Sequence, residues 1–188
     1  MIHVVNFRDK IPPDGFVVNA TSRSGNWSKG LSPFFLGPCE LYGGHVAKNV
    51  ENLWQFCKVY SNMVDSSGDP SEVYWEWAKK GWSDDYAHRY PAGKGAIPLY
   101  SYWDGEKLDY IEARKRIYIP LYSAAVKKSK AYEMLVDTYK NLDTDLYIMD
   151  FDAYYHRNLG MTYDDVINNP NKKMGHGFVL AMMLEGFI

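Results

Sequence analysis

Short runs of apolar and β-branched residues alternate with longer segments whose apolar positions recur at helical spacing. Residues 2–7 and 16–20 are runs of the first kind, and the Pro- and Gly-containing residues 12–15 between them predict a turn joining two strands. Residues 34–41 predict a further strand pair, and residues 145–151 alternate between apolar and polar positions as a strand does.

Helical spacing predicts the remaining elements. The expected helices cover residues 47–60, 71–80, 109–128, 131–140 and 175–187. Ser71 is placed to cap the second helix. Pro120 lies inside the third and predicts a kink or a split, because proline has no backbone N–H. Together the elements indicate an α+β fold, a single helix-rich domain over residues 1–188 around a small mixed or antiparallel sheet.

One long segment, residues 81–103, has no regular pattern. It carries Tyr90, Tyr100, Tyr102 and Trp103, and this aromatic content argues against disorder. Irregular segments of this length in a compact domain are commonly functional.

Composition narrows the possible functions. A formal net charge of −2 predicts no strong sequence-independent electrostatic binding to a phosphate backbone, so any nucleic-acid contact must be local. The chain holds 16 Tyr and 6 Trp, which suits either stacking on flat ligands or a core filled with rings. Cys39 and Cys57 are its only cysteines and fit a reducing compartment. No signal-peptide pattern or membrane-spanning run is visible, so we expect a cytoplasmic protein without membrane contact.

The segment around residue 54 carries candidate chemistry. Glu51, Gln55 and Lys58 are spaced to stack along one side of a helix, flanked by bulky apolar residues such as Trp54. The row indicates a polar pocket cut into a core. The alternative is a surface helix whose charges are in water.

Three blocks of sequence follow one another in a recognisable order. They are Leu31-Ser32-Pro33-Phe34 with Leu41-Tyr42-Gly43-Gly44 and residues 50–58; Ala87-His88-Arg89-Tyr90 with Pro98-Leu99; and Leu146-Tyr147-Ile148 with residues 152–155 and Met174-Gly175. Their order and spacing resemble the NADAR family of NAD- and ADP-ribose-associated N-glycosidases. Residues 89–96 also resemble a set of small proteins from large tailed bacteriophages.

The chain departs from the family pattern in several places. Pro33 stands where the family usually has Asn, and Asn52 where it usually has His. Tyr155-His156 replaces Trp-Gly, and Lys172 replaces the last Asn. We therefore expect a divergent, bacteriophage-type member.

The resemblance implies cleavage of an N-glycosidic bond between ADP-ribose and a nucleobase. Glu51 and Asp152 are the candidate catalytic carboxylates, one to stabilise positive charge on the ribose and one to donate a proton, and we expect them to meet across a common cavity. Lys58 could act through a Schiff base or simply pair with an acid. The expected substrate-binding residues are Ser32, Phe34, Trp54, Gln55, Arg89, Lys94, Trp103, Tyr155 and Gly175.

Within this group, Arg89 and Lys94 would hold phosphate, while Trp103 and Tyr155 would stack on a base or pack in the core. No histidine spacing suits a metal, so we expect neither metal nor cofactor. The expected partner is ADP-ribosylated DNA or nucleobase, and the expected product is ADP-ribose. We expect the protein to be a monomer. Its expected role is to reverse the ADP-ribosylation of phage DNA by a host toxin. Two alternatives stay open: hydrolysis of a free ribosylamino-pyrimidine phosphate, and non-catalytic binding of ADP-ribose or another nucleotide.

Overall fold

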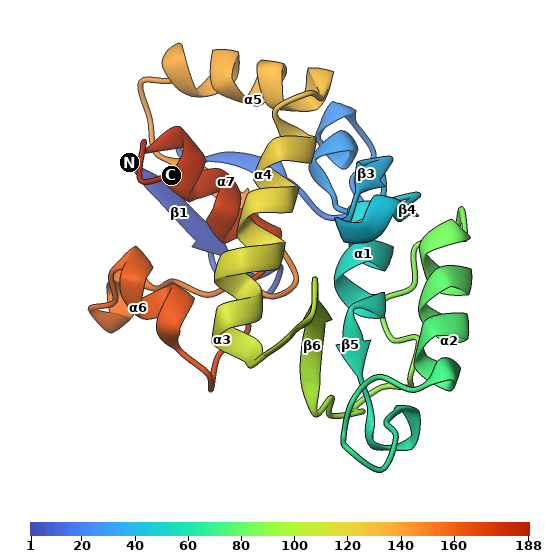
Figure 1. Cartoon of the computed structure of the whole chain (residues 1–188). Coiled ribbons are helices and arrows are strands. Elements are labelled where there is room, and N and C mark those ends of the chain that lie inside the picture. The colour runs from blue at the N-terminus through green and yellow to red at the C-terminus, as the bar shows by residue number, and fades with distance from the viewer. The chain divides into compact units, whose positions relative to one another are not determined.

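The computed structural model describes residues 1–188, and the chain forms two compact units. Unit 1 comprises Met1–Pro33 and Tyr122–Ile188, and unit 2 comprises Phe34–Leu121. The predicted α+β class is confirmed, since helices and small sheets both contribute to the fold (Figure 1). A single domain over the whole length stays a prediction.

Unit 1 is built on a parallel sheet of three strands. Strands β1 (Ile2–Val5) and β2 (Phe16–Asn19) lie on either side of β8 (Leu146–Met149), and both run parallel to it. The two N-terminal strands were expected from their apolar runs, but they do not pair with each other. The buried strand β8 takes the central position, so this sheet is neither mixed nor antiparallel.

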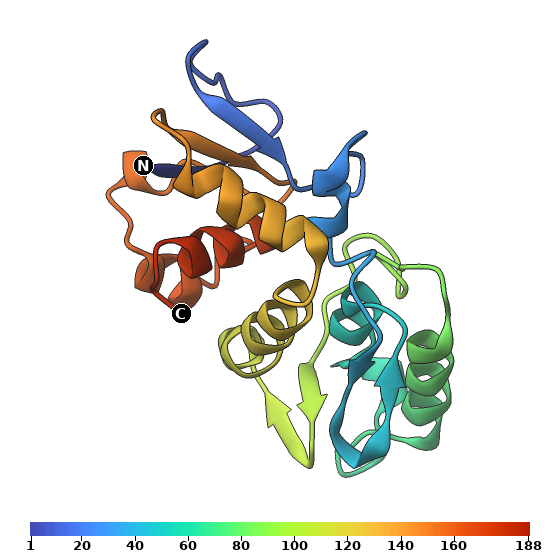
Figure 2. The same ribbon diagram turned by 90° about the horizontal axis from the view of Figure 1, so that it is seen from above.

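Helix α7 (His176–Leu184) covers part of this sheet within unit 1. It packs against β1 and β8 and is buried along almost its whole length, because nearly every residue in it is apolar or glycine (Figure 2). The other elements of unit 1 are η1 (Trp27–Leu31), α5 (Lys130–Lys140), η5 (Arg157–Leu159) and α6 (Tyr163–Asn168).

Unit 2 combines a pair of packed helices with two antiparallel sheets. Its elements are β3 (Cys39–Glu40), η2 (Tyr42–Gly44), β4 (Val46–Ala47), α1 (Val50–Phe56), β5 (Lys58–Val59), η3 (Ser61–Met63), α2 (Glu72–Ser83), β6 (Tyr100–Trp103), β7 (Glu106–Leu108) and α3 (Tyr110–Ala113). Strands β3 and β4 form a hairpin, and β5, β6 and β7 form a sheet in that order. Helices α1 and α2 approach closely at Gly81, where a Cβ atom would lie 2.1 Å from the Phe56 ring.

Several predicted boundaries differ from the observed ones. The helix expected over residues 47–60 is α1 alone, because Asn49 caps its start and Lys58–Val59 leaves it to pair with β6. The strand pair expected over 34–41 is reduced to β3. Ser71 occupies the N-cap position of α2, but its hydroxyl donates to the carbonyl of Met63 instead of capping.

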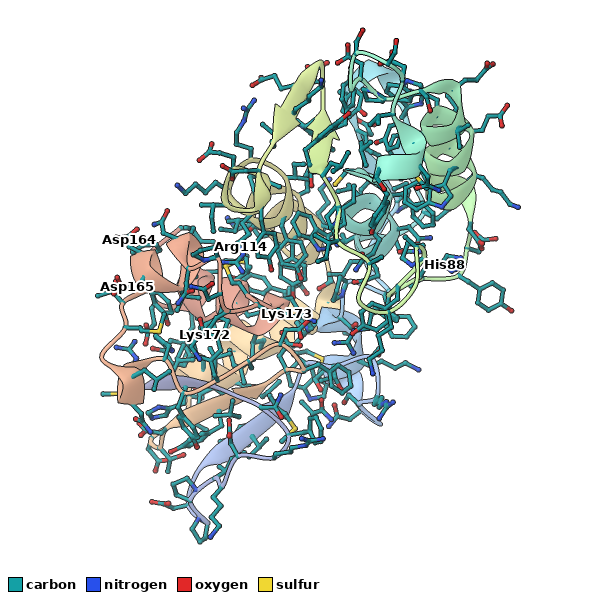
Figure 3. The ribbon with its side chains drawn as sticks, turned by 90° about the horizontal axis from the view of Figure 1, so that it is seen from below. His88, Arg114, Asp164, Asp165, Lys172 and Lys173 are labelled. Atoms are coloured by element: carbon teal, nitrogen blue, oxygen red, sulfur yellow. The ribbon has the colours of Figure 1, made fainter.

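The predicted break near Pro120 is a π-helical turn. Helix α3 continues as Arg114–Tyr118 in π conformation and then as α4 (Ile119–Val126), whose bounds cross the division between the units. Pro120 has no backbone N–H to donate, and its ring would clash with the preceding turn of an α-helix. The wider π-helical turn accommodates both. Arg114 in this turn is buried, and its guanidinium lies 4.2 Å from the centre of the Tyr110 ring (Figure 3).

None of the helices is both long enough and apolar enough to cross a membrane.

Candidate functional site

The polar row predicted on α1 is present in unit 2. Gln55 Nε2 donates to Glu51 Oε1 over 2.9 Å, and Lys58 Nζ donates to Gln55 Oε1 over 2.7 Å. The helical spacing brings the first two together, and Lys58 reaches back from the first residue of β5. Glu51 is only 6% exposed, so the alternative of a solvated surface carboxylate does not hold. The amide of Gln55 thus links a buried acid to an amine.

Aromatic rings line the amine end of this row. Lys58 Nζ lies 4.8 Å from the centre of the Trp54 ring, and Trp54 in turn packs against Tyr118 at a ring separation of 5.0 Å. A ring face under an amine attracts the charged ammonium form. The neighbouring Cys57 thiol is fully buried, and burial raises its pKa to about 11 despite the positive charge of Lys58. Cys57 is therefore a protonated core residue and not a nucleophile.

Asn52 connects α1 to the irregular segment that follows α2. Its Nδ2 group donates to the carbonyls of Asp84 and Tyr86 at 3.0 and 2.8 Å, and its Oδ1 accepts from the N–H of His88 at 2.8 Å. His88 also lies 2.9 Å from the Asp84 carboxylate, and this hydrogen bond lowers the pKa of Asp84 (Figure 3). The residue that replaces the expected histidine is therefore a structural anchor.

The anchored segment carries the two predicted phosphate-binding residues. Arg89 directly follows the anchored His88, and its guanidinium lies 5.4 Å from the centre of the Tyr90 ring. Lys94 is exposed farther along, between Gly93 and Gly95. The anchor ties the start of this segment to α1, so the backbone next to Arg89 is held beside the helix that carries Glu51.

Trp103 lies in an aromatic cluster of unit 2. Its ring meets Tyr42 edge-on at 5.0 Å, and Tyr42 also contacts Tyr102 and Trp82. Tyr102 packs on Trp75 as well. Both Tyr102 and Trp103 are half-buried, and their ring contacts fit packing within the unit.

In unit 1, the predicted acid follows the central strand. Asp152 lies three residues after β8, its side chain is 35% exposed, and Lys173 Nζ is 3.8 Å away. Lys172 in the same segment lies over the Tyr154 ring at 4.7 Å (Figure 3). The carboxyl ends of parallel strands are where α/β sheets usually bind ligands, so Asp152 occupies a suitable edge.

Two other predicted residues of unit 1 have evident structural roles. The hydroxyl of Tyr155 donates to the carbonyl of Lys10 over 2.8 Å, which fixes its ring beside the N-terminal loop. Gly175 lets helix α7 approach the end of β8, since a Cβ atom there would lie 2.1 Å from Asp150 Oδ2.

Ser32 and Phe34 lie on opposite sides of the division between the units. Ser32 is buried at the end of η1 in unit 1, and Phe34 is half-buried as the first residue of unit 2. Glu51 and Asp152 likewise belong to different units, so the expectation that these two carboxylates share one cavity stays a prediction.

The sequence patterns did not indicate a buried acid–histidine pair in unit 1. Asp150 accepts from the N–H of Gly177 at 2.9 Å and from that of Phe151 at 2.6 Å, and His176 Nδ1 lies 3.2 Å from Asp150 Oδ2. His176 Nε2 lies 2.7 Å from the carbonyl of Ala20, which can only accept, so this nitrogen carries a hydrogen. Two features of the sequence could have indicated this pair: Asp150 lies near the end of the predicted strand, and residues 175–177 are Gly-His-Gly at a predicted helix start.

No group of three or more His, Cys, Asp or Glu side chains is arranged to hold a metal ion.

The fold and the row on α1 together define a small α+β protein with a buried carboxylate–amide–amine arrangement. The chain belongs to the DUF6939 family, a family of unknown function, which matches residues 3–158. No curated protein and no solved structure matches it. The matched region includes Glu51, Lys58 and Asp152 and ends before Gly175.

Proposed function

We propose that this protein is an N-glycosidase that removes ADP-ribose from nucleobases in DNA. The observation that carries the proposal is the row on α1, where a buried Glu51 is joined through Gln55 to Lys58. Burying a carboxylate costs free energy, and a site that stabilises positive charge on a sugar carbon is one use for such a group.

Glu51 would stabilise the cationic sugar. As the bond from ribose C1 to the base nitrogen breaks, positive charge develops on C1 and on the ring oxygen, and a nearby carboxylate lowers the energy of that state. Water then adds to C1. The proton that this water loses balances the proton that the leaving nitrogen takes up. The hydrogen bond from Gln55 orients the carboxylate, which favours a fixed geometry at the reacting carbon.

Asp152 would provide the second carboxyl group, either to protonate the leaving nitrogen or to orient water. Its position at the carboxyl edge of the parallel sheet and its partial exposure suit a group that exchanges protons with solvent. Arg89 would bind the diphosphate of ADP-ribose through its guanidinium fork.

Lys58 has two possible roles that a single substitution separates. Its hydrogen bond to Gln55 and its place over the Trp54 ring favour the charged ammonium, which would act electrostatically. A Schiff base instead requires a neutral amine, and it is available only for ADP-ribose on an exocyclic amine such as that of guanine. We expect Lys58→Arg to keep most of the activity in the electrostatic role and to abolish turnover in the Schiff-base role.

The test uses two oligonucleotides, one carrying ADP-ribosyl-guanine and one carrying ADP-ribosyl-thymine. We expect the wild-type protein to restore at least one of them and to release ADP-ribose. Glu51→Gln should lose roughly 100-fold or more in rate, because it keeps the size of the side chain and removes its charge. Glu76→Gln, an exposed position on α2, is the matched control. Failure on both oligonucleotides, with hydrolysis of free ribosylamino compounds, would contradict the DNA substrate.

One observation favours a second candidate, non-catalytic binding of ADP-ribose. Asn52 stands where the resembled family has histidine and is committed to holding a loop. Binding of ADP-ribose by the wild-type protein without any product over many hours would support this candidate. In either role the proposed place of action is the cytoplasm of a host cell, where the protein would counteract DNA ADP-ribosylation by a toxin.

A further inference from the structure

The segment Tyr86–Leu99 of unit 2 exposes large apolar side chains to an unusual degree. Tyr86 is 81% exposed and Ile97 is 86% exposed, and Tyr90 and Leu99 are also exposed. Leaving such groups in water gains nothing for the fold, and a loop that exposes several of them is a candidate interaction site.

Both ends of this loop are held firmly by hydrogen bonds. Asn52 holds the carbonyl of Tyr86 and the N–H of His88, and at the other end the N–H of Leu99 donates to the carbonyl of Val59 over 2.8 Å. Two turns shape the part between, with the N–H of Gly93 bonded to the carbonyl of Tyr90 and that of Ala96 to the carbonyl of Gly93. The exposed side chains therefore project from a defined loop.

The loop has the opposite charge to the chain as a whole. Residues 86–103 contain Arg89 and Lys94 and no acidic residue, while the full chain has a net charge of −2. Of the two acids just before the loop, Asp85 lies 3.6 Å from Lys48 Nζ. Lys94 is exposed within the loop, so the expected partner is anionic.

The backbone of the loop is open at its two glycines. No heavy atom lies within 4 Å of the Cβ position at Gly93 or Gly95, and both residues have positive φ angles, 98° and 89°. At Gly95 a phosphate group can therefore approach the peptide N–H without meeting a side chain, whereas the N–H of Gly93 is already bonded to the carbonyl of Tyr90.

We propose that the Tyr86–Leu99 loop binds a single-stranded nucleic acid. Unpaired bases stack on the Tyr86 ring and contact Ile97, while Lys94 and the backbone N–H of Gly95 hold the phosphates. A duplex hides its base faces, and this loop has neither helix nor strand to enter a groove. The inference extends the proposed function to the strand around the modified base, but it does not depend on cleavage of a glycosidic bond.

The test measures binding of the full-length protein to unmodified DNA, so it remains informative if the proposed hydrolysis is absent. Fluorescence anisotropy is recorded with a labelled single strand of about 12 nucleotides and with a duplex of the same sequence. We expect the single strand to bind more tightly than the duplex. Tyr86→Ala should weaken single-strand binding roughly tenfold, and Tyr86→Phe, which keeps the ring, should not.

A charge-matched pair of variants tests the phosphate contact. Lys94→Gln should reduce the slope of log affinity against log salt by about 0.7, whereas Lys79→Gln, an exposed lysine on α2, should leave the slope unchanged. Equal binding of wild type and Tyr86→Ala, equal affinity for duplex, or binding to anionic phospholipid vesicles without binding to the strand would each overturn the proposal.

Discussion

A single amide determines where the loop after α2 begins. Asn52 is fully buried, and both hydrogens of its Nδ2 group are donated to backbone carbonyls. A buried polar side chain with satisfied bonds is inexpensive to keep, but removing one partner leaves the others unpaired. Replacing Asn52 would therefore leave up to three backbone groups of the loop without their hydrogen-bond partner.

Asn52→Asp tests this role with almost no change of shape. The substitution sets a carboxylate oxygen against the carbonyls of Asp84 and Tyr86, and we expect the free energy of unfolding to fall by about 3 kcal/mol. Urea denaturation at neutral pH measures it. Asn168→Asp is the control, since that amide is exposed and donates only to the carbonyl of Asp164. A loss no larger than that of the control would refute the anchoring role.

At the scale of elements, the junction between β8 and α7 depends on close approach. The carboxylate of Asp150 at the end of the strand accepts from the N–H of Gly177 in the first turn of the helix, and Gly175 leaves space for that contact. The start of α7 is thus stabilised by an acid from another element, while the N-cap residue itself makes no side-chain bond.

Gly175→Ala should disturb this junction. The added Cβ would meet Asp150 Oδ2 and the carbonyl of Asp152, so the strand end must shift, and we expect a loss of roughly 1–3 kcal/mol in stability. Thermal unfolding followed by circular dichroism provides the measurement. Gly25→Ala in the same unit, where nothing lies within 4 Å of the Cβ position, should be close to neutral. Equal melting temperatures for the two variants would contradict the close-approach argument.

Elements encoded by local spacing were predictable, and those that depend on distant partners were not. Helical periodicity anticipated α5 and the contact between Glu51 and Gln55, because both depend on neighbours within two turns, whereas Lys58 joins the row from strand β5. The central position of β8 and the Asp150–His176 pair were missed, because each is created by segments far apart in the chain. The end of α1 was also placed too late, since pairing with β6 competes with helix extension.

For the molecule as a whole, one buried histidine links stability to pH. His156 packs on Tyr163 with ring centres 5.1 Å apart and edge-on to Phe178, and burial lowers its pKa from 6.5 to about 4. The nearby charges of Arg157 and Glu185 act in opposite directions on that pKa and are secondary to burial. The folded state therefore favours the neutral ring.

The consequence is a loss of stability in mild acid. Between about pH 6.5 and pH 4 the unfolded chain binds a proton at His156 that the folded chain does not, so stability is complete above this window and decreases as pH falls through it. The contribution is at most about 3 kcal/mol. Denaturation at a series of pH values should show a smaller decrease for His156→Phe than for wild type. Parallel curves for the two proteins would show that this residue does not titrate as described.

The order of strands in unit 1 also constrains synthesis. Strands β1 and β2 leave the ribosome early, yet the strand that joins them is β8, and its first residue, Leu146, pairs with Ile2. Contacts so distant in the chain form slowly, and none of them is available to a nascent chain that ends before residue 146. All of unit 2 is synthesised between β2 and β8. A ribosome-bound chain stalled before β8 should therefore expose the two early strands to chaperones and proteases, and the sheet can form only after β8 has left the ribosome.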